Sequence, residues 1–190
     1  MTTKKNTLQD IMDTGLALIQ ERGYNGFSYA DISEAIGIRK ASIHYHFATK
    51  TDLVHAILNR YERDFDENLR AIHIHYPTPL EKLEAYFGLY RATLEDNSKL
   101  CLCSMMAAEI YSFPVEIRDK LNSFFENNVD WLKPVLDQGK QQGEFRFSNC
   151  AKGQAEMIVA FVQGAQILAK STGEIKQYNI LVQHYMQSLT

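Results

Sequence analysis

The stretch GIRKASIHYHFATKTDL, residues 37–53, brings two kinds of side chain together in one short segment. Apolar Ile43 and Phe47 have the spacing that places side chains on one face of a helix. The other positions carry cationic or hydrogen-bonding side chains, namely Arg39, Lys40, Ser42, His44, Tyr45, His46 and Lys50. Arg and Lys suit guanine edges and phosphates, and hydroxyl groups donate to phosphate oxygens. The segment therefore indicates a short helix that faces DNA.

The residues before this segment favour a helix-turn-helix. Apolar side chains recur at helical spacing over residues 8–19, and Gly23 is a candidate for the end of that helix. Ser28 stands where a helix N-cap is expected, and Asp31 replaces the Glu of a capping box. The short helix that begins there should end at Gly37. Two helices joined by a glycine turn, the second with exposed donors, follow the helix-turn-helix order.

Residues 8–53 resemble the N-terminal domain of the TetR (tetracycline-repressor-like) family of bacterial transcriptional regulators. The resemblance rests on Gly23-Tyr24, Ser28, Asp31-Ile32, Ala35, Gly37-Ile38, Tyr45, His46-Phe47, Lys50 and Leu53. It implies that Ser28, Tyr45 and Lys50 contact backbone phosphates. It also implies that the side chains at or near base edges are Arg39, Lys40, Ser42, His44 and His46.

Two residues depart from the family pattern. Arg39 stands where Ser or Thr usually caps the recognition helix, and Ala41 stands where Gly is common. An Arg side chain has no oxygen with which to cap a helix, so Arg39 favours a direct contact with DNA. Ala41 adds a methyl group that can touch a thymine methyl or simply favour the helix. The base sequence recognised does not follow from these residues.

Basic charge is local in this chain. The formal net charge is -3, whereas the first 60 residues contain seven Lys and Arg against six Asp and Glu. Lys4 and Lys5 are candidates for a short arm that reaches DNA. An acidic remainder limits non-specific association with a polyanion and leaves discrimination to the recognition helix.

Composition favours a cytoplasmic protein. The first fifteen residues contain Asp10 and Asp13 and no long apolar run, so no signal peptide is expected. The most apolar window, residues 157–169, is too short to span a bilayer, so no membrane partner is expected. Three cysteines without the spacing of a disulfide framework suit a reducing compartment.

Helical periodicity continues beyond residue 53, so the predicted fold is all-α. We expect a three-helix domain with a helix-turn-helix at residues 1–52. Residues 53–190 should form a helical domain for effector binding and dimerisation. Its predicted helices are a linking helix that ends before Pro77, helices that begin at Pro79, after the cap Ser98 and at Pro114, and residues 149–171 and 174–189.

The last two predicted helices are candidates for a dimer interface. The window 157–169 is apolar on nearly every side, and the final helix has a single apolar stripe. The resemblance implies that two such helices from each subunit form a four-helix bundle, with an intramolecular core as the alternative. A dimer would also pair two recognition helices about one DNA turn (~34 Å) apart. The assigned interface residues are Phe161, Val162, Ala165, Leu168, Leu181, Val182, Tyr185 and Leu189.

Aromatic and soft apolar side chains in the middle helices are candidates for an effector pocket, with an ordinary core as the alternative. With Ser98 as a helix N-cap, Cys101 would lie in the first turn, where the helix dipole favours a thiolate. We therefore hypothesise that Cys101, or Cys103, senses electrophiles or oxidants; a buried structural cysteine is the alternative. The predicted pocket residues are Phe87, Tyr90, Cys101, Met105, Met106, Tyr111 and Trp131.

Enzyme chemistry is not indicated by any motif in the sequence. It contains no phosphate-binding glycine loop, paired-carboxylate constellation or Ser-His-Asp arrangement. The histidine pairs 44/46 and 73/75 have the wrong spacing for a two-His chelate on one helix, so no metal or cofactor is expected. The sequence predicts a homodimeric repressor that leaves double-stranded operator DNA when an apolar, aromatic or thiol-reactive effector binds. The alternatives are a small-molecule-binding or thiol-redox protein without specific DNA binding, and an activator on the same scaffold.

Overall fold

The computed structural model describes residues 6–96 and 98–190, and these residues are arranged in two compact units. Unit 1 contains the described residues up to Arg63 together with Leu102–Asp119. Unit 2 contains Asp64–Cys101 and Lys120–Thr190. Lys4 and Lys5, the predicted arm, lie outside the described residues.

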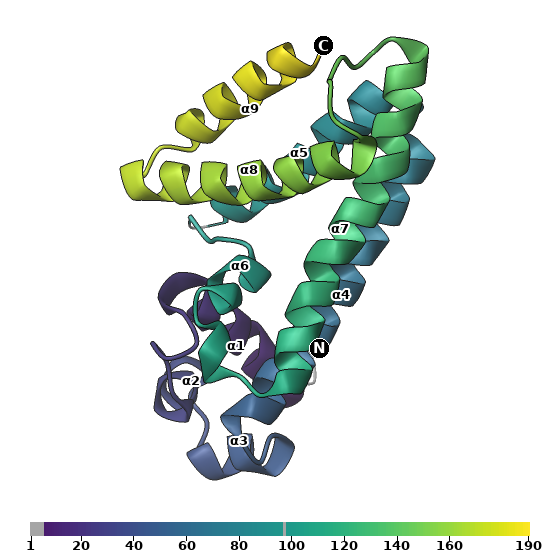
Figure 1. The fold of residues 1–190 in the computed structure, drawn as a ribbon. Helices are drawn as coiled ribbons and strands as arrows, with labels where there is room; N and C mark the ends of the chain where they lie inside the picture. Colours follow the sequence, from purple (N-terminus) through teal and green to yellow (C-terminus); the bar gives the residue numbers. More distant parts are fainter. Residues whose placement is uncertain (1–5, 97) are drawn as a thin grey trace, which may run out of the picture. The chain divides into compact units, whose positions relative to one another are not determined.

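All regular structure in the described residues is helical, which confirms the predicted all-α fold (Figure 1). None of the described helices is both long enough and apolar enough to cross a lipid bilayer. In chain order the helices are α1 (Thr7–Arg22), α2 (Tyr29–Ile36), α3 (Lys40–His46), α4 (Lys50–His75), α5 (Pro79–Glu95), α6 (Leu102–Ala107), the 3-10 helix η1 (Ile110–Ser112), α7 (Val115–Gln142), α8 (Ala151–Thr172) and α9 (Ile175–Leu189).

The two units divide inside α4, and this differs from the predicted boundary after residue 52. The helix runs without a break from Lys50 to His75, so it belongs to unit 1 at its start and to unit 2 beyond Arg63. The chain then returns to unit 1 with α6 and the beginning of α7. Residue 52 therefore lies within a helix that both units share.

Unit 1 is built on the helices predicted around the recognition segment. Its fully buried side chains come from α1, α2, α3 and the start of α4, and they include Ile11, Ile19, Ile32, Ile43, Leu53 and Ile57. A Cβ on Gly15 of α1 would lie 2.8 Å from Ile57 Cδ1, so a glycine there permits the close approach of α1 and α4. Gly37 ends α2 in the left-handed region, with φ 69°, which confirms the predicted glycine turn.

Unit 2 surrounds a buried polar cluster. Asn128 of α7 is 1% exposed, and its Oδ1 accepts hydrogen bonds from Tyr86 Oη at 3.0 Å and Tyr90 Oη at 3.2 Å. Its Nδ2 donates to Phe124 O at 2.7 Å. The cluster is therefore satisfied within the unit, as buried polar groups require. At the edge of the unit Pro79 opens α5 after a capping box of Thr78 and Glu81, which confirms the predicted start of that helix.

The predicted helix from Ser98 to Ile110 is wrong. Ser98 has a φ of 55° and does not cap a helix, and α6 spans only Leu102–Ala107. Just before α6, Cys101 N donates to Gln166 Oε1 of α8 at 3.1 Å. This contact with a distant residue holds the chain before α6. Cys101 thus directly precedes α6 and does not lie in the first turn of a helix capped by Ser98.

Candidate DNA-binding interface

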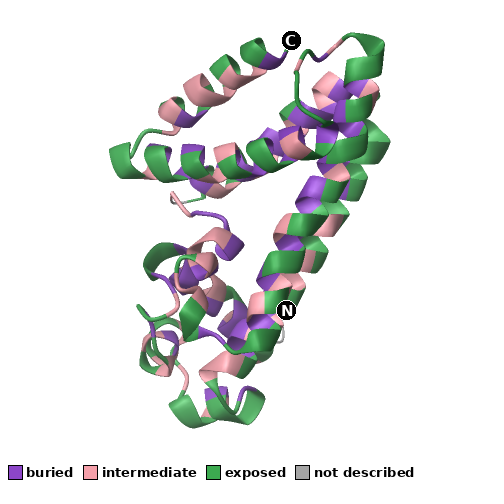
Figure 2. Cartoon of the chain, in the orientation of Figure 1, coloured by how far each residue is buried: buried purple, intermediate pink, exposed green. Residues whose placement is uncertain are grey.

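The recognition helix α3 presents most of its polar side chains to solvent. Ile43 is 0% and Phe47 is 7% exposed, whereas Tyr45 is 86% exposed. Figure 2 shows the corresponding exposed surface of α3 around its buried side. Ser42 is half-buried, and the exposed predicted base-edge residues are Arg39, Lys40, His44 and His46. The structure therefore brings the predicted base-edge residues together on one outward-facing element, and their DNA contacts stay predictions.

Arg39 occupies the N-cap position of α3 without capping it. Its backbone is extended, and its side chain makes no hydrogen bond to the first turn of the helix. This confirms the inference that Arg39 has no capping role. An exposed guanidinium at the start of the recognition helix is available for a base edge or a phosphate.

Tyr29 supports α3, although the sequence analysis did not single it out. Its hydroxyl lies 3.0 Å from Phe47 O and 2.6 Å from Thr49 O, the carbonyls at the end of α3 and in the following turn. Its ring meets the His44 ring edge-on, with centroids 4.9 Å apart. Burial raises the pKa of Tyr29 to about 12, so the hydroxyl stays a donor at neutral pH. A contact that spans such a sequence separation leaves no signal in local periodicity.

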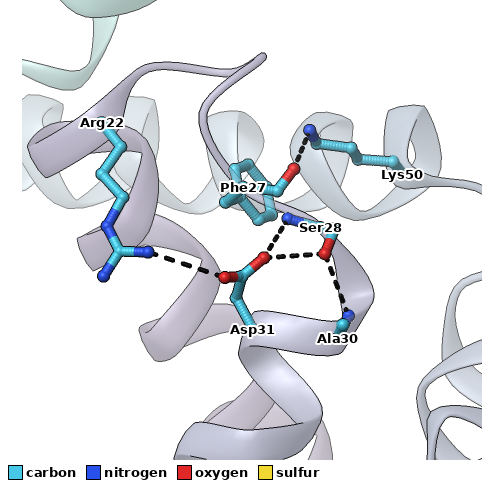
Figure 3. Close-up of polar contacts among 6 residues, drawn as sticks. All are labelled: Arg22, Phe27, Ser28, Ala30, Asp31 and Lys50. Carbon is cyan, nitrogen blue, oxygen red and sulfur yellow. Dashed lines mark hydrogen bonds and ion pairs between the residues drawn. The ribbon is translucent and has the colours of Figure 1, made fainter.

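The cap of α2 has the predicted form (Figure 3). Ser28 Oγ accepts from Ala30 N at 3.2 Å, and Asp31 Oδ2 accepts from both Ser28 N and Ser28 Oγ at 2.7 Å. These hydrogen bonds hold the pKa of the Asp31 carboxyl below its ordinary value. The predicted capping box is confirmed. Ser28 is exposed, and its contact with a phosphate stays a prediction.

Lys50 has protein partners that the sequence did not reveal (Figure 3). Its Nζ donates to Tyr24 O and, at 2.5 Å, to Phe27 O. The same ammonium lies 4.3 Å from the Tyr24 ring centroid and 4.1 Å from that of Phe27, so it makes cation–π contacts as well. Burial holds the pKa of Lys50 below its usual range. Lys50 therefore joins the start of α4 to the loop between α1 and α2.

Lys50→Ala should destabilise the fold, because it leaves two part-buried carbonyls without their charged donor. We expect the free energy of unfolding to fall by about 1.5–3 kcal/mol, measured by urea denaturation. The predicted phosphate contact adds a separate effect, a loss of about one in the slope of log affinity against log salt. Lys40→Ala, at an exposed position, should leave unfolding unchanged. An unaltered salt slope in Lys50→Ala would remove Lys50 from the DNA interface.

A second long-range contact holds the loop between α1 and α2. Asn25 N donates to Glu109 Oε2 at 3.0 Å, and Asn25 Nδ2 donates to Glu109 Oε2 at 2.5 Å and to Ser112 Oγ at 3.0 Å. The Tyr24 ring packs on Phe113 with centroids 4.6 Å apart. The segment after α6 is thus fastened to the same loop that Lys50 contacts from the start of α4. These contacts leave no local pattern in the sequence, because the residues lie far apart along the chain.

Several residues predicted for the dimer interface are buried in the core of the protomer. Val162, Ala165 and Leu189 are 0%, 3% and 2% exposed, so they are core residues rather than interface residues. Phe161 stacks on Tyr185 with ring centroids 4.4 Å apart, and Tyr185 Oη accepts from Gln154 at 2.7 Å. Leu181 and Val182 are half-buried, whereas Leu168 is 53% exposed.

The exposed apolar surface of α8 is a stripe at helical spacing. Met157, Ile167 and Leu168 are 51%, 54% and 53% exposed, and Ala160 and Gly164 between them are exposed as well (Figure 2). We call these five residues the α8 stripe. The predicted interface set combines buried Val162 and Ala165 with exposed Leu168, because a helix that is apolar on nearly every side does not show which side its own core covers.

The predicted effector residues belong to both units and differ in exposure. Phe87, Tyr90, Cys101 and Met106 are each no more than 2% exposed, and Met105 is half-buried. Tyr111 is 93% exposed, which corrects its assignment to a pocket wall. Phe87 and Trp131 line two different cavities, both within unit 2.

Comparison with known proteins supports a regulatory role. Residues 11–57 match the family model described as bacterial regulatory proteins, tetR family. The crystal structure of a TetR-family transcriptional regulator from Agrobacterium tumefaciens is 32% identical to this chain, with a TM-score of 0.93, and covers 99% of this chain and 100% of its own. The HTH-type transcriptional repressor DhaR from Mycobacterium sp. (strain GP1) is 25% identical over 166 residues, which span 85% of this chain and 81% of DhaR. A crystal structure of AibR in complex with isovaleryl coenzyme A and operator DNA is 25% identical, with a TM-score of 0.69, over 85% of this chain and 86% of that one.

Proposed function

The chain belongs to the TetR family of bacterial transcriptional regulators, and we propose that it represses transcription as a homodimer on double-stranded operator DNA until a small-molecule effector releases it. Regulation by DNA binding, and not catalysis, is what its relatives share. The observation that carries the proposal is the exposed surface of α3, where Arg39, Lys40 and Tyr45 stand beside two exposed histidines. We assign the protein to the cytoplasm, where operator DNA is accessible.

The fold supports DNA binding by fixing α3 rather than by general charge. The net charge of the chain is -3, so non-specific attraction to DNA is weak. Tyr29 holds the end of α3, and the Ser28 cap and Lys50 hold the elements around it. A recognition helix held in this way can place several side chains at base edges in one fixed register, which is how specificity arises.

The homodimer provides two copies of α3. One short helix reads only a few base pairs, so two half-sites are needed for a usable specificity. The α8 stripe is the surface we assign to the partner copy, because it is a contiguous row of exposed apolar residues on a helix. A two-fold axis through this stripe would pair the same surface of both subunits.

Effector release acts through α4 in this proposal. The helix is continuous from Lys50 to His75, so a change in its position in unit 2 is carried to the start of the helix, next to α3. An altered separation of the two recognition helices would cost affinity for paired half-sites. AibR, with a bound acyl thioester and operator DNA in one crystal structure, supports the idea of a small-molecule effector for this chain.

Fluorescence anisotropy on DNA from the protein's own upstream region tests this function. We expect tight binding that survives an excess of non-specific competitor and weakens steeply with salt. The absence of a specific complex would favour the alternative, a small-molecule-binding or thiol-redox protein. An in vitro transcription assay separates a repressor from an activator, since only a repressor lowers transcript yield when it is added.

The same assay decides whether the effector is thiol-reactive. Cys101 and Cys103 are both 0% exposed, whereas Cys150 is exposed. A quinone or diamide should therefore modify Cys150 first. If the effector is an apolar ligand that binds reversibly, this modification should leave DNA binding intact. Loss of binding that thiol restores, and that Cys101→Ser prevents, would instead establish Cys101 as a sensor.

Tyr45→Ala should weaken DNA binding by roughly 10-fold without destabilising the protein, because the side chain is 86% exposed and we propose that its hydroxyl donates to a phosphate. The loss should be similar on operator and random DNA, since phosphate contacts carry no sequence information. Tyr111→Ala is the matched control, because Tyr111 is 93% exposed outside α3. Equal affinities of the Tyr45→Ala and Tyr111→Ala variants, measured by anisotropy, would exclude Tyr45 from the interface.

A further inference from the structure

A cavity of about 510 Å³ lies in unit 2 between the end of α4, the first turns of α5 and the middle of α7. Trp131 and Pro134 form part of its apolar wall. Arg70, Lys82 and Asp130 are charged residues that line the same cavity. An apolar chamber with a few charged groups is the usual form of a small-molecule site.

Lys82 is the unusual member of this set. It is only 7% exposed, and no residue of 6–96 or 98–190 forms a hydrogen bond or ion pair with its ammonium group. The neighbouring carboxylate of Glu81 is engaged elsewhere, because it accepts from Thr78 N at 3.1 Å and Thr78 Oγ1 at 2.9 Å. The Lys82 ammonium is not among the described buried side-chain atoms that lack a partner, so the stem of the side chain is buried while the ammonium keeps contact with the solvent in the cavity, where an anion can reach it.

The position of Lys82 in α5 makes an anionic partner more favourable still. Lys82 lies in the first turns of α5, whose N-terminus is the positive end of the helix dipole. The dipole therefore repels the ammonium group and attracts an anion placed beside it. The charge of Lys82 and the orientation of α5 favour the same kind of ligand.

The rim of the cavity adds the positive charge of Arg70. Arg70 and His73, from one face of α4, are exposed and line the same cavity. Among the described lining residues Asp130 is the one acid, and it forms no ion pair with Lys82, Arg70 or His73 in this part of the chain. The cavity thus carries a net positive charge at its mouth and on its wall, which would attract an anion.

We propose that this cavity binds a small amphipathic monoanion, with a carboxylate at Lys82 and an apolar chain against Trp131, Pro134 and Val135. The proposal rests on the proposed function and names the chemical class of the effector. The Lys82 ammonium is a compact point charge and suits one singly charged head group. The walls beyond Lys82 offer apolar contact for the rest of the ligand.

Trp131 makes the proposal directly measurable, because it is the one tryptophan in the sequence. Its ring is stacked on Tyr86, with centroids 5.7 Å apart and planes inclined by 16°. A ligand against the cavity wall would change the surroundings of this indole. Its fluorescence therefore responds to a ligand in this cavity.

The test is a titration of the full-length protein with octanoate and, in parallel, with octan-1-ol, followed by tryptophan emission and by calorimetry. The two probes have the same chain and differ in the charge of the head group. We expect saturable octanoate binding at least 10-fold tighter than octanol binding. Lys82→Met should weaken octanoate binding at least 10-fold and leave octanol binding unchanged, because it keeps the length of the side chain and removes its charge. Lys133→Met, at an exposed position of α7, should bind both probes as the unchanged protein does.

Three results would overturn the proposal. These are equal affinity for the acid and the alcohol, octanoate affinity unchanged in Lys82→Met, and octanoate binding by calorimetry with no response of Trp131. The melting temperature of Lys82→Met should equal or exceed that of the unchanged protein, which separates loss of the site from loss of the fold. Operator binding without any octanoate binding would leave the repressor function in place and reject the anion site. Octanoate binding without a specific DNA complex would leave the anion site in place and reject the repressor function.

Discussion

The double substitution Ile167→Asp and Leu168→Asp should convert the protein from a dimer to a monomer. Both side chains are more than half exposed in the α8 stripe, at 54% and 53%, so the folded protomer tolerates charge at these positions. In a two-fold interface the change would bury four unpaired carboxylates, each costing about 3–5 kcal/mol. Size-exclusion chromatography with light scattering should show a monomer with unchanged helical circular dichroism.

The same variant should lose specific DNA binding, because a monomer engages one half-site only. We expect affinity for the operator to fall by roughly 10³-fold or more, to the level of non-specific binding. Asn122→Asp with Ser123→Asp introduces two adjacent charges on the exposed surface of α7 and should change neither property. A variant at positions 167 and 168 that remains dimeric would show that the interface lies elsewhere.

Asn128→Ala should be the most destabilising single substitution in the polar cluster of unit 2. It removes the acceptor of Tyr86 Oη and Tyr90 Oη and the donor to Phe124 O, all at a position that is 1% exposed. Buried polar groups that lose their partners cost about 1–3 kcal/mol each. We therefore expect the free energy of unfolding to fall by about 2–4 kcal/mol, measured by urea denaturation with far-ultraviolet circular dichroism.

Asn127 gives the matched control for Asn128, since it is the preceding residue of α7 and is exposed. Asn127→Ala should change stability by less than about 0.5 kcal/mol. If both variants unfold at the same urea concentration, the hydrogen bonds around Asn128 add no net stability. A double-mutant cycle that combines Asn128→Ala with Tyr86→Phe would then measure the interaction energy between these two residues, because residues in one network do not contribute additively.

Local signals were sufficient to predict the helix-turn-helix. Ser28 and Asp31 form the expected capping box, and Gly37 takes the left-handed conformation that ends α2. Ile43 and Phe47 face inward as their spacing indicated. Each of these features depends on residues within a few positions of one another, so periodicity and capping preferences contain the necessary information.

The start of α6 and the buried face of α8 could not be predicted in this way. Ser98 is a good N-cap by residue type, but the chain before α6 is held by Gln166 through a hydrogen bond to Cys101 N. In α8, apolar residues surround the helix, and only packing against α5 and α9 separates buried Val162 from exposed Leu168. Tertiary contacts override local propensity in both places.

By itself the sequence determined the all-α fold, the helix-turn-helix and the exposed polar face of α3, because these depend on short-range spacing and backbone preference. Only the tertiary structure decided what the individual charged side chains contact. It directs the ammonium of Lys50 to the carbonyls of Tyr24 and Phe27, and it buries Lys82 beside Trp131. Desolvation and hydrogen bonding depend on neighbours that are distant along the chain, and no local pattern encodes those neighbours.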